Sequence, residues 1–175
     1  MNEVIKALLE RRSIRNFKKE MPSQEEIDQI LEAGLYAASG RGSQNTICLV
    51  VRNKDLRKKL QEDNCAIWKR DPGIDPFYGA PLIIIVLAPS DSDNGAYDGS
   101  LVLGNMMLAA HAIGLGSVWI NRARQEFERE DYKRILKDMG IKGEWTGVGH
   151  LAVGYIDGEY PKASERKANR VFYID

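Results

Sequence analysis

One uninterrupted apolar run constrains the fold of this chain more than any other feature. Residues 82–88 read LIIIVLA and follow directly on Pro81. The length of the run and its β-branched side chains predict a strand that is covered on both faces, because a strand with one wet face alternates apolar and polar residues. The rest of the chain must therefore supply elements that cover both sides of this strand.

Periodic patterns predict the elements around this strand. Apolar residues at helical spacing predict helices over 3–12, from Ser23 onward, over 98–113 and over 128–139, with a short charged helix over 55–62. Ser23 and Glu26 have the spacing of a capping box. Runs rich in β-branched residues predict strands over 46–52, 117–120 and 147–155.

Three further segments have distinctive compositions. The helix over 98–113 is apolar nearly all round, which is typical of a helix buried in a core or an interface. Residues 39–44 contain two glycines and predict a loop, and residues 63–79 are expected to be irregular because they hold several Pro and Gly turns. The chain end at 171–174 reads VFYI, and an apolar end is usually docked on another surface.

Composition restricts the partners of the chain. Lys plus Arg and Asp plus Glu number 25 each, so no general field attracts nucleic acid or an acidic membrane. Cys48 and Cys65 form no CxxC pair, so we interpret them as buried structural thiols, and no metal site is expected. His111 and His150 lie in apolar runs and are interpreted as core or supporting residues. No signal peptide precedes the first helix, so we expect a cytoplasmic protein with one domain over 1–175.

The sharpest local feature is a cluster of arginines at the end of the first predicted helix. Arg11, Arg12 and Arg15 surround Ser13 in the sequence RRSIR. Within a helix these like charges would repel each other by roughly 0.3 kcal/mol per pair. A phosphate ester would reverse the sign, because guanidinium groups bind phosphate oxygens with paired charge-assisted hydrogen bonds. Cations that complement a helix dipole explain the cluster equally well at this point.

A second basic stretch lies near the C-terminus. It contains Lys162, Arg166, Lys167 and Arg170. By itself this pattern is typical of a solvated tail. The competing interpretation is that both basic stretches bind one dianionic ligand.

Motifs of several other enzyme classes do not occur in the sequence. The chain has no GxGxxG between a strand and a helix, no Walker motif, no HExxH and no GxSxG. Asp98 and Glu144 have no carboxylate partner at an identifiable spacing. Hydrolysis by paired acid and base residues is therefore not supported.

Five segments, in order along nearly the whole chain, resemble the FMN-dependent nitroreductase family. They are RRSIRNF, AASGRGSQ, YGAPLIIIV, GNMMLAAHAIGLGSVW and the closing strand with GY followed by PKASERK. The resemblance implies an α+β fold with a mainly antiparallel central sheet, helices on both faces and an interlocked homodimer with FMN at the subunit interface. It also implies that the helix over 98–113 is the central helix of that interface, and that the VFYI end adds to the partner's sheet.

The resemblance also assigns candidate FMN-binding residues in three groups. Contacts to the phosphate and ribityl chain fall on Arg11, Arg12, Ser13, Arg15, Lys162 and Arg166. A loop that reaches the flavin from the partner subunit falls on Ala38, Ser39, Gly40 and Gln44. The segment beside the isoalloxazine ring, where a backbone N–H approaches flavin N5, falls on Trp119, Ile120 and Asn121. Trp68, Phe77 and Tyr78 either line the acceptor pocket or belong to the core.

The implied activity is that of an NAD(P)H-dependent flavin oxidoreductase. Hydride would pass from NADH or NADPH to flavin N5 and then to a small acceptor of nitroaromatic or quinone type, by a ping-pong mechanism without a catalytic side chain. Two alternatives stay open. One is another flavin reaction on the same fold, such as dehalogenation, ene reduction or flavin fragmentation, and the other is a non-enzymatic FMN-binding protein. A nucleic-acid module is disfavoured by the balanced charge.

Overall fold

The computed structural model describes residues 1–174, built around a four-stranded sheet in which every neighbouring pair is antiparallel. The strands are β1 (Ile47–Val51), β2 (Leu82–Pro89), β3 (Gly116–Ile120) and β4 (Trp145–Gly154), in the spatial order β1-β2-β4-β3. The helices are α1 (Glu3–Glu10), α2 (Gln24–Leu35), α3 (Lys54–Trp68), α4 (Gly95–Ala112), α5 (Ala123–Phe127) and α6 (Glu130–Asp138), and a 3-10 turn, η1 (Gly40–Gly42), precedes β1.

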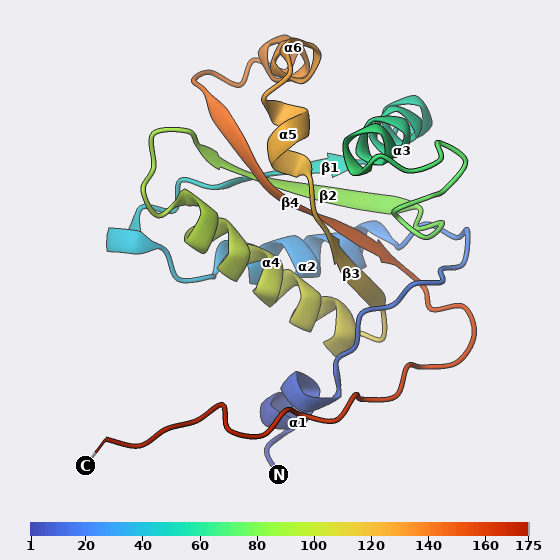
Figure 1. Cartoon of the computed structure of the whole chain (residues 1–175), viewed down its shortest axis with the longest axis vertical. Helices are drawn as coiled ribbons and strands as arrows, with labels where there is room; N and C mark the ends of the chain where they lie inside the picture. Colours follow the sequence, from blue (N-terminus) through green and yellow to red (C-terminus); the bar gives the residue numbers. More distant parts are fainter. Residues whose placement is uncertain (175) are drawn as a thin grey trace.

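Helices cover both faces of the sheet (Figure 1). On one face α2 and α4 enclose a core that includes Leu103 and Met106. On the other face α3, α5 and α6 enclose a core that includes Leu60 and Leu136. Strand β2 lies between the two cores, and residues 82–88 are all buried. These observations confirm the predicted doubly covered strand and the α+β class with helices on both faces.

Helix α4 is buried on one side only. Leu103 and Met106 face the sheet, whereas Tyr97 and Leu101 are 71% and 50% exposed. Helix α1 packs against α4 but buries none of its own residues, and Leu9 on α1 is exposed. The apolar residues of α4 therefore serve the core on one side and form an exposed surface with α1 on the other. No helix within residues 1–174, α4 included, is long and apolar enough to cross a membrane.

Two predictions about helices were wrong, and both errors involve a buried polar residue. Helix α3 continues to Trp68 instead of ending at residue 62, because Asn64 belongs to its buried face beside Leu60. Helix α5 was missed, because its fully buried Glu126 interrupts the apolar pattern. The other predicted helices and strands are present, with boundaries that differ by at most three residues.

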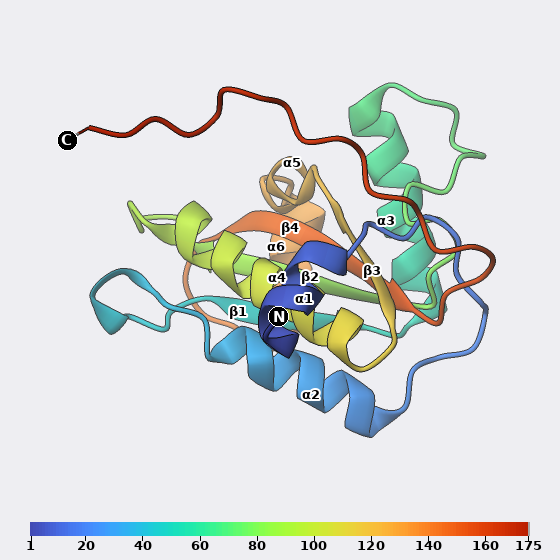
Figure 2. The same cartoon turned by 90° about the horizontal axis from the view of Figure 1, so that it is seen from below.

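The C-terminal tail leaves the body after β4 (Figures 1 and 2). Its first residues are held by an antiparallel bridge between Ile156 and Phe17. The residues from Asp157 to 174 are exposed, with Phe172 and Tyr173 at 81% and 87%. The apolar end that was predicted to be docked is therefore not buried by its own chain, and Asp175 lies outside the described residues.

Glu26 joins the start of α2 to the end of β4. The Ser23 hydroxyl accepts from the Glu26 N–H at 3.2 Å, and Glu26 Oε2 accepts from the Ser23 N–H at 2.8 Å, which completes the predicted capping box. The same Oε2 accepts from the Tyr155 hydroxyl at 2.7 Å. The bond from Tyr155, followed by those from Ser23, lowers the pKa of Glu26 because hydrogen bonds to the carboxylate favour its charged form.

We predict that Glu26→Gln destabilises the protein by about 1 kcal/mol at neutral pH. A carboxylate with a depressed folded pKa stabilises the fold above its unfolded pKa of about 4.3, and this stabilisation is lost as the pH falls through the folded value. Urea unfolding over a pH series should show a wild-type advantage that is constant above about pH 5 and shrinks below it. Glu25→Gln, at the neighbouring exposed position, is the control, and an equal loss in both variants would contradict the prediction.

Candidate functional site

The predicted arginine cluster lies where α1 ends and the chain turns toward the sheet. Arg12 Nη1 donates to the carbonyls of Leu9 and Arg11, both at 2.7 Å, so this nitrogen does cap the helix. Arg11 Nη1 and Arg12 Nε, however, are buried and have no hydrogen-bond partner among the described residues. Arg15 is exposed beside them. Buried guanidinium nitrogens without acceptors are costly, so the cluster fits an anionic ligand better than helix capping alone.

The residues after Arg12 are attached to the start of β3. Ser13 forms an isolated parallel bridge with Ser117, and the Ile14 N–H donates to the Ser117 carbonyl at 3.0 Å. Gly116 permits this approach, because a Cβ there would lie 2.9 Å from the Ile14 side chain. The arginine cluster therefore lies at one end of β3, and the predicted ring-binding segment 119–121 lies at the other, roughly 13 Å along the strand.

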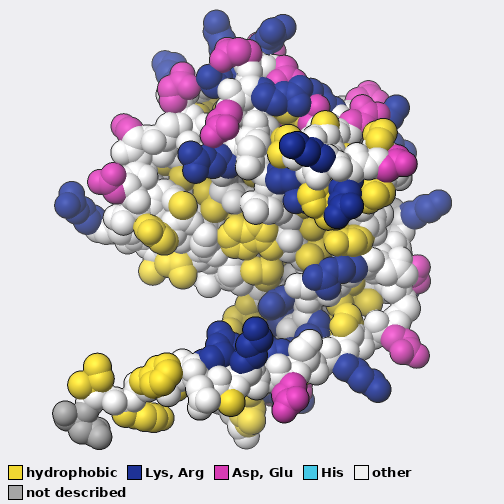
Figure 3. Space-filling model, in the orientation of Figure 1, with side chains coloured by type: hydrophobic (Ala, Val, Ile, Leu, Met, Phe, Trp, Pro, Cys, Tyr) yellow, Lys and Arg dark blue, Asp and Glu magenta, His cyan; other side chains and the backbone are white. Residues whose placement is uncertain are grey.

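Figure 3 shows that this side of the molecule is hollowed between the body and the arm formed by α1 and the tail. Lys and Arg side chains gather at the inner end of the hollow, and hydrophobic side chains lie on the body above it. Because the net charge of the chain is zero, the positive charge here is a local concentration. This is the arrangement expected of an anion site in a neutral protein.

Tyr160 fastens the start of the tail to the arginine cluster. Its hydroxyl accepts from the Arg12 N–H at 2.9 Å, donates to the Glu10 carbonyl at 3.1 Å and lies 3.2 Å from His111 Nδ1. Burial lowers the pKa of His111, Arg11 and Arg12 lower it further, and Glu10 opposes them. Sequence spacing offered no sign of this contact, because 148 positions separate Tyr160 from Arg12.

The second basic stretch begins directly after this anchor. Lys162 and Arg166 are exposed on the tail. Arg166 Nε and Nη2 donate to the Ser164 carbonyl at 3.1 and 2.7 Å. The structure therefore brings the beginning of the tail to the arginine cluster and leaves Lys162 and Arg166 in solvent.

The predicted flavin-reaching loop lies beside the first turn of α4 (Figure 1). The arginine cluster lies near the last turn of the same helix, where Tyr160 contacts His111. Ser39 Oγ accepts from the Gln44 N–H at 3.0 Å, and the Gly40 N–H donates to Asp98 Oδ1 at 2.9 Å. Asp98 is 4% exposed, and its Oδ2 has no partner among the described residues. Ala38, Ser39, Gln44 and Asp98 line a pocket of about 140 Å³. Asp98 thus supports the loop from the first turn of α4.

One chain does not bring the loop and the arginine cluster together. Asp98 lies beside the loop, and His111 lies near the arginines through Tyr160. The two are 13 positions apart on α4, which corresponds to roughly 20 Å along a helix. The sequence-predicted residues therefore form two half-sites, one with the arginines and segment 119–121 and one with the loop.

The predicted ring-binding segment ends β3. Trp119 is half-buried on the α4 side, Ile120 is buried in the opposite core, and Asn121 is exposed. The carbonyls of Ile120 and Asn121 are hydrogen-bonded to His150 Nδ1 at 3.2 Å and Asn64 Nδ2 at 3.0 Å. The supporting role expected of His150 is consistent with this contact, whereas Asn64 lies in helix α3, in a segment that is predicted to be irregular from its composition.

A cleft of about 380 Å³ opens next to Asn121, between the start of α4 and the start of β4. Its polar lining residues are mostly small, with one cation, Arg124, and one anion, Asp93, and the small ones include Ser90, Ser100 and Thr146. The cleft is thus adjacent to segment 119–121, at the end of α4 that is remote from the arginines, and can admit a small polar molecule.

The aromatic residues considered for an acceptor pocket lie elsewhere. Phe77 is fully buried in the core, and Tyr78 packs against that core. Trp68 is 41% exposed, with the Arg122 guanidinium 4.7 Å from its ring centroid. Of the two open interpretations, the structure favours the core for Phe77 and Tyr78.

Comparison with known proteins identifies relatives over most of the chain. The profile described as "Nitroreductase family" matches residues 8–155. An FMN reductase (NAD(P)H) from Bacillus subtilis strain 168 is 32% identical over 146 residues, which cover 71% of this chain and 56% of that relative. The chain thus spans little more than half the length of that relative.

Two other relatives match over most of the length of both chains. A solved FMN-dependent nitroreductase from Clostridium difficile R20291 superposes with a TM-score of 0.87 at 26% identity, covering 99% of both chains. An iodotyrosine deiodinase from Thermotoga neapolitana is 25% identical over 170 residues, which cover 87% of this chain and 88% of that relative.

Both cysteine thiols are expected to be inert in the folded protein. Burial raises the pKa of Cys48 to about 11 and also raises the pKa of Cys65, which is fully buried. Because the thiolate is the reactive form, titration with Ellman's reagent near pH 8 should find no rapidly reacting thiol before unfolding and two after it. A folded-state thiol that reacts at the rate of free cysteine would contradict this prediction.

Proposed function

The chain belongs to the nitroreductase family, and from this premise we propose that it binds FMN as a homodimer and acts as an NAD(P)H-dependent flavin oxidoreductase. One observation carries the proposal. Arg11 Nη1 and Arg12 Nε are buried cationic nitrogens without an acceptor, and a phosphate group supplies the acceptors that they need.

The arginine half-site has the layout that FMN requires. FMN carries a dianionic phosphate at one end of a five-carbon ribityl chain and a flat ring at the other. Arg11, Arg12, Ser13 and Arg15 would hold the phosphate, and the ribityl chain would follow β3 toward the ring-binding segment 119–121. Lys162 and Arg166 would add to the phosphate site, since Tyr160 already brings the start of the tail to Arg12.

A second copy of the chain would complete the site. The outer faces of α1 and α4 expose apolar side chains, among them Leu8, Leu9 and Leu101, and the tail exposes Phe172 and Tyr173. Contiguous exposed apolar surface is typical of an interaction site. In a two-fold dimer the loop of one subunit, with Ala38, Ser39, Gly40 and Gln44, would approach the flavin held by the arginines of the other.

The bound flavin would supply the hydride chemistry, taking hydride from NADH or NADPH and passing it to a small acceptor of nitroaromatic or quinone type in a ping-pong sequence. The residues of the chain would bind, orient and exclude water. The cleft beside Asn121 is our candidate for the acceptor site, because it adjoins the ring-binding segment and its polar lining can orient a small acceptor.

One specific observation favours a second candidate function. The relative that is named an iodotyrosine deiodinase matches this chain over 88% of its own length, so reductive dehalogenation on the same fold is the alternative. The two candidates differ only in the acceptor. A panel of nitroaromatics, quinones and halogenated phenols, each tested with the FMN-loaded protein, separates them.

The test of the proposal is the visible spectrum of the purified protein. We expect a yellow protein with a flavin band, or a colourless protein that acquires the band when excess FMN is added. The band should remain after the unbound FMN is removed by dialysis. Anaerobic NADH or NADPH should bleach the band, and one of the acceptors should restore it. A preparation that stays colourless after incubation with FMN would refute the proposal, whereas a yellow protein that neither nicotinamide bleaches would leave only the FMN-binding part.

We predict that Arg15→Ala raises the dissociation constant for FMN by about tenfold to a hundredfold. A hydrogen bond to a charged partner contributes about 1.5–3 kcal/mol, and each 1.4 kcal/mol is a factor of ten in affinity. Fluorescence titration of the cofactor-free protein measures the change. Arg134→Ala removes an equally charged, exposed side chain on α6 and is the control, which should bind FMN like the wild type. Equal affinities of the two variants would count against the phosphate site.

A further inference from the structure

A cluster of buried polar side chains lies behind the segment 120–122, and we call it the inner cluster. Its members are Asn64 on α3, Arg122 in the turn after β3, Glu126 on α5 and His150 on β4. Asn64, Glu126 and His150 are all 0% exposed. Buried polar groups are costly unless they are fully paired, so their presence requires a reason beyond packing.

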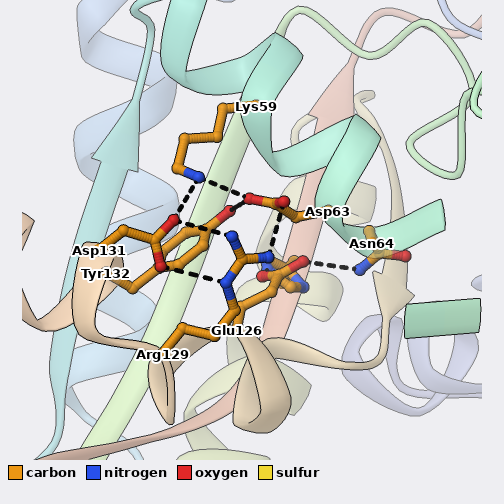
Figure 4. A network of polar contacts seen from close by, with 8 residues as sticks. Lys59, Asp63, Asn64, Glu126, Arg129, Asp131 and Tyr132 are labelled. Carbon is orange, nitrogen blue, oxygen red and sulfur yellow. Dashed lines mark hydrogen bonds and ion pairs between the residues drawn. The ribbon is translucent and has the colours of Figure 1, made fainter. Parts of the chain in front are cut away.

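The members of the inner cluster satisfy one another. His150 Nε2 and Glu126 Oε2 are 2.6 Å apart. Asn64 Nδ2 donates to Glu126 Oε1 at 3.1 Å, as Figure 4 shows. Arg122 Nε donates to Asn64 Oδ1 at 2.8 Å. Each of the four side chains therefore has a partner from a different element of the fold.

Two hydrogen bonds leave the inner cluster, and both go to backbone carbonyls of the predicted ring-binding segment. His150 Nδ1 lies 3.2 Å from the Ile120 carbonyl, and Asn64 Nδ2 donates to the Asn121 carbonyl at 3.0 Å. Because a carbonyl only accepts, His150 Nδ1 must carry a hydrogen. His150 Nε2 and Glu126 then share one proton, so the pair is neutral overall whichever of the two holds it.

These bonds, together with the pairing of Ile120 with His150 in the sheet, fix which way two peptide N–H groups point. The described chain has no cis peptide bond, and in a trans peptide the N–H points opposite to the C=O. With the Ile120 and Asn121 carbonyls turned into the inner cluster, the N–H groups of Asn121 and Arg122 point away from it. Within residues 1–174 neither N–H donates a hydrogen bond.

Arg122 has an unusual backbone conformation at the turn between β3 and α5. Its φ is 82°, in the left-handed region, which costs a residue other than glycine about 1 kcal/mol or more. This conformation turns the chain from the end of β3 into α5, for which Arg122 is the N-cap residue. The bond from Arg122 to Asn64 helps to offset the cost of this conformation.

We propose that Asn64, Glu126 and His150 are positioning residues that present the N–H groups of Asn121 and Arg122 to the flavin ring. The inference rests on the proposed function, which places the ring beside segment 119–121. Donors that are fixed in advance stabilise negative charge as it develops on the reduced ring without reorganising. The three side chains act through the backbone and do not touch the cofactor.

A neighbouring cluster provides the control. Lys59, Asp63, Arg129, Asp131 and Tyr132 form an outer cluster that links α3 to α6 (Figure 4). The Tyr132 hydroxyl donates to Asp63 at 2.8 Å, and no bond of this cluster reaches the backbone of 120–122. Tyr132→Phe therefore removes one partly buried hydrogen bond on the same side of the sheet as the inner cluster. It leaves the bonds to the carbonyls of Ile120 and Asn121 in place.

The first measurement is the rate at which saturating NADPH bleaches the FMN-loaded protein. Asn64→Leu removes the donor to the Asn121 carbonyl, and we expect the rate to fall by about tenfold or more, because small misplacements of donors are costly. The dissociation constant for FMN should change by less than about threefold, because the phosphate contacts remain. Tyr132→Phe should leave both quantities near the wild-type values. Equal effects of the two substitutions on the rate would overturn the proposal.

The second measurement is rescue by a conservative variant. Glu126→Leu leaves Asn64 and His150 without their shared partner and should slow bleaching like Asn64→Leu. Glu126→Gln keeps both contacts, because its carbonyl accepts from Asn64 and its amide N–H donates to a neutral His150. We therefore expect Glu126→Gln to bleach at nearly the wild-type rate. A Gln variant as slow as the Leu variant would overturn the proposal.

The third measurement does not depend on catalysis or on any variant that might misfold. In the wild-type protein the backbone N–H resonances of Asn121 and Arg122 should shift when FMN is added to the cofactor-free form. Unchanged resonances in a protein that binds FMN would overturn the positioning proposal and leave the proposed function intact. Failure to bind FMN at all would instead remove the proposed function, and the positioning proposal with it.

Discussion

Strand β3 is held at both ends, and the layout of the proposed site follows from this constraint. It is an edge strand, paired only with β4 in the sheet, so its other edge is available to a ligand or another segment. At its start the Ile14 N–H bonds to Ser117, and at its end the carbonyls of Ile120 and Asn121 bond to the inner cluster. The arginine segment 11–15 and the ring-binding segment 119–121 are about a hundred positions apart in the sequence, and they thereby lie at the two ends of a strand of five residues. A ligand that is charged at one end and flat at the other matches this spacing.

A neutral chain can present positive charge only where its cations lack carboxylate partners. In the outer cluster Lys59 and Arg129 are paired with Asp63 and Asp131, and these pairs raise the pKa of Arg129. They form a stabilising link and offer nothing to a ligand. Arg11 and Arg12 differ because two of their nitrogens are buried without an acceptor. It is this difference in pairing, and not the number of basic residues, that distinguishes a candidate phosphate site from an ordinary charged surface.

The sequence predicted the elements that carry a clear local signature. Strand β2 was confirmed from its continuous apolar run, the start of α2 from its capping box, and α4 from its apolar composition. The end of α3 and the whole of α5 were not predicted, because Asn64 and Glu126 are polar residues on buried helical faces and break the apolar period. The arginine cluster was visible as a local pattern, whereas Tyr160 and Asp98 act through contacts between distant positions that no spacing reveals. The residues that support the candidate site were thus the least predictable, since their partners are set by the fold.

The division of the candidate residues into two half-sites also gives a physical reason for the exposed apolar surface. The loop is supported by Asp98 at one end of α4, and the arginines lie near the other end, so neither can move to the other without unfolding α4. A two-fold axis that passes beside α4 would bring the loop of one subunit to the arginines of the other and would cover the outer faces of α1 and α4 in the same step. FMN bound in this way would contact both subunits, and a ligand that binds only the associated state stabilises that state by mass action. Under the proposed function, cofactor binding and dimer stability are therefore linked, and the apolar faces of α1 and α4 belong to the flavin site as much as the arginines do.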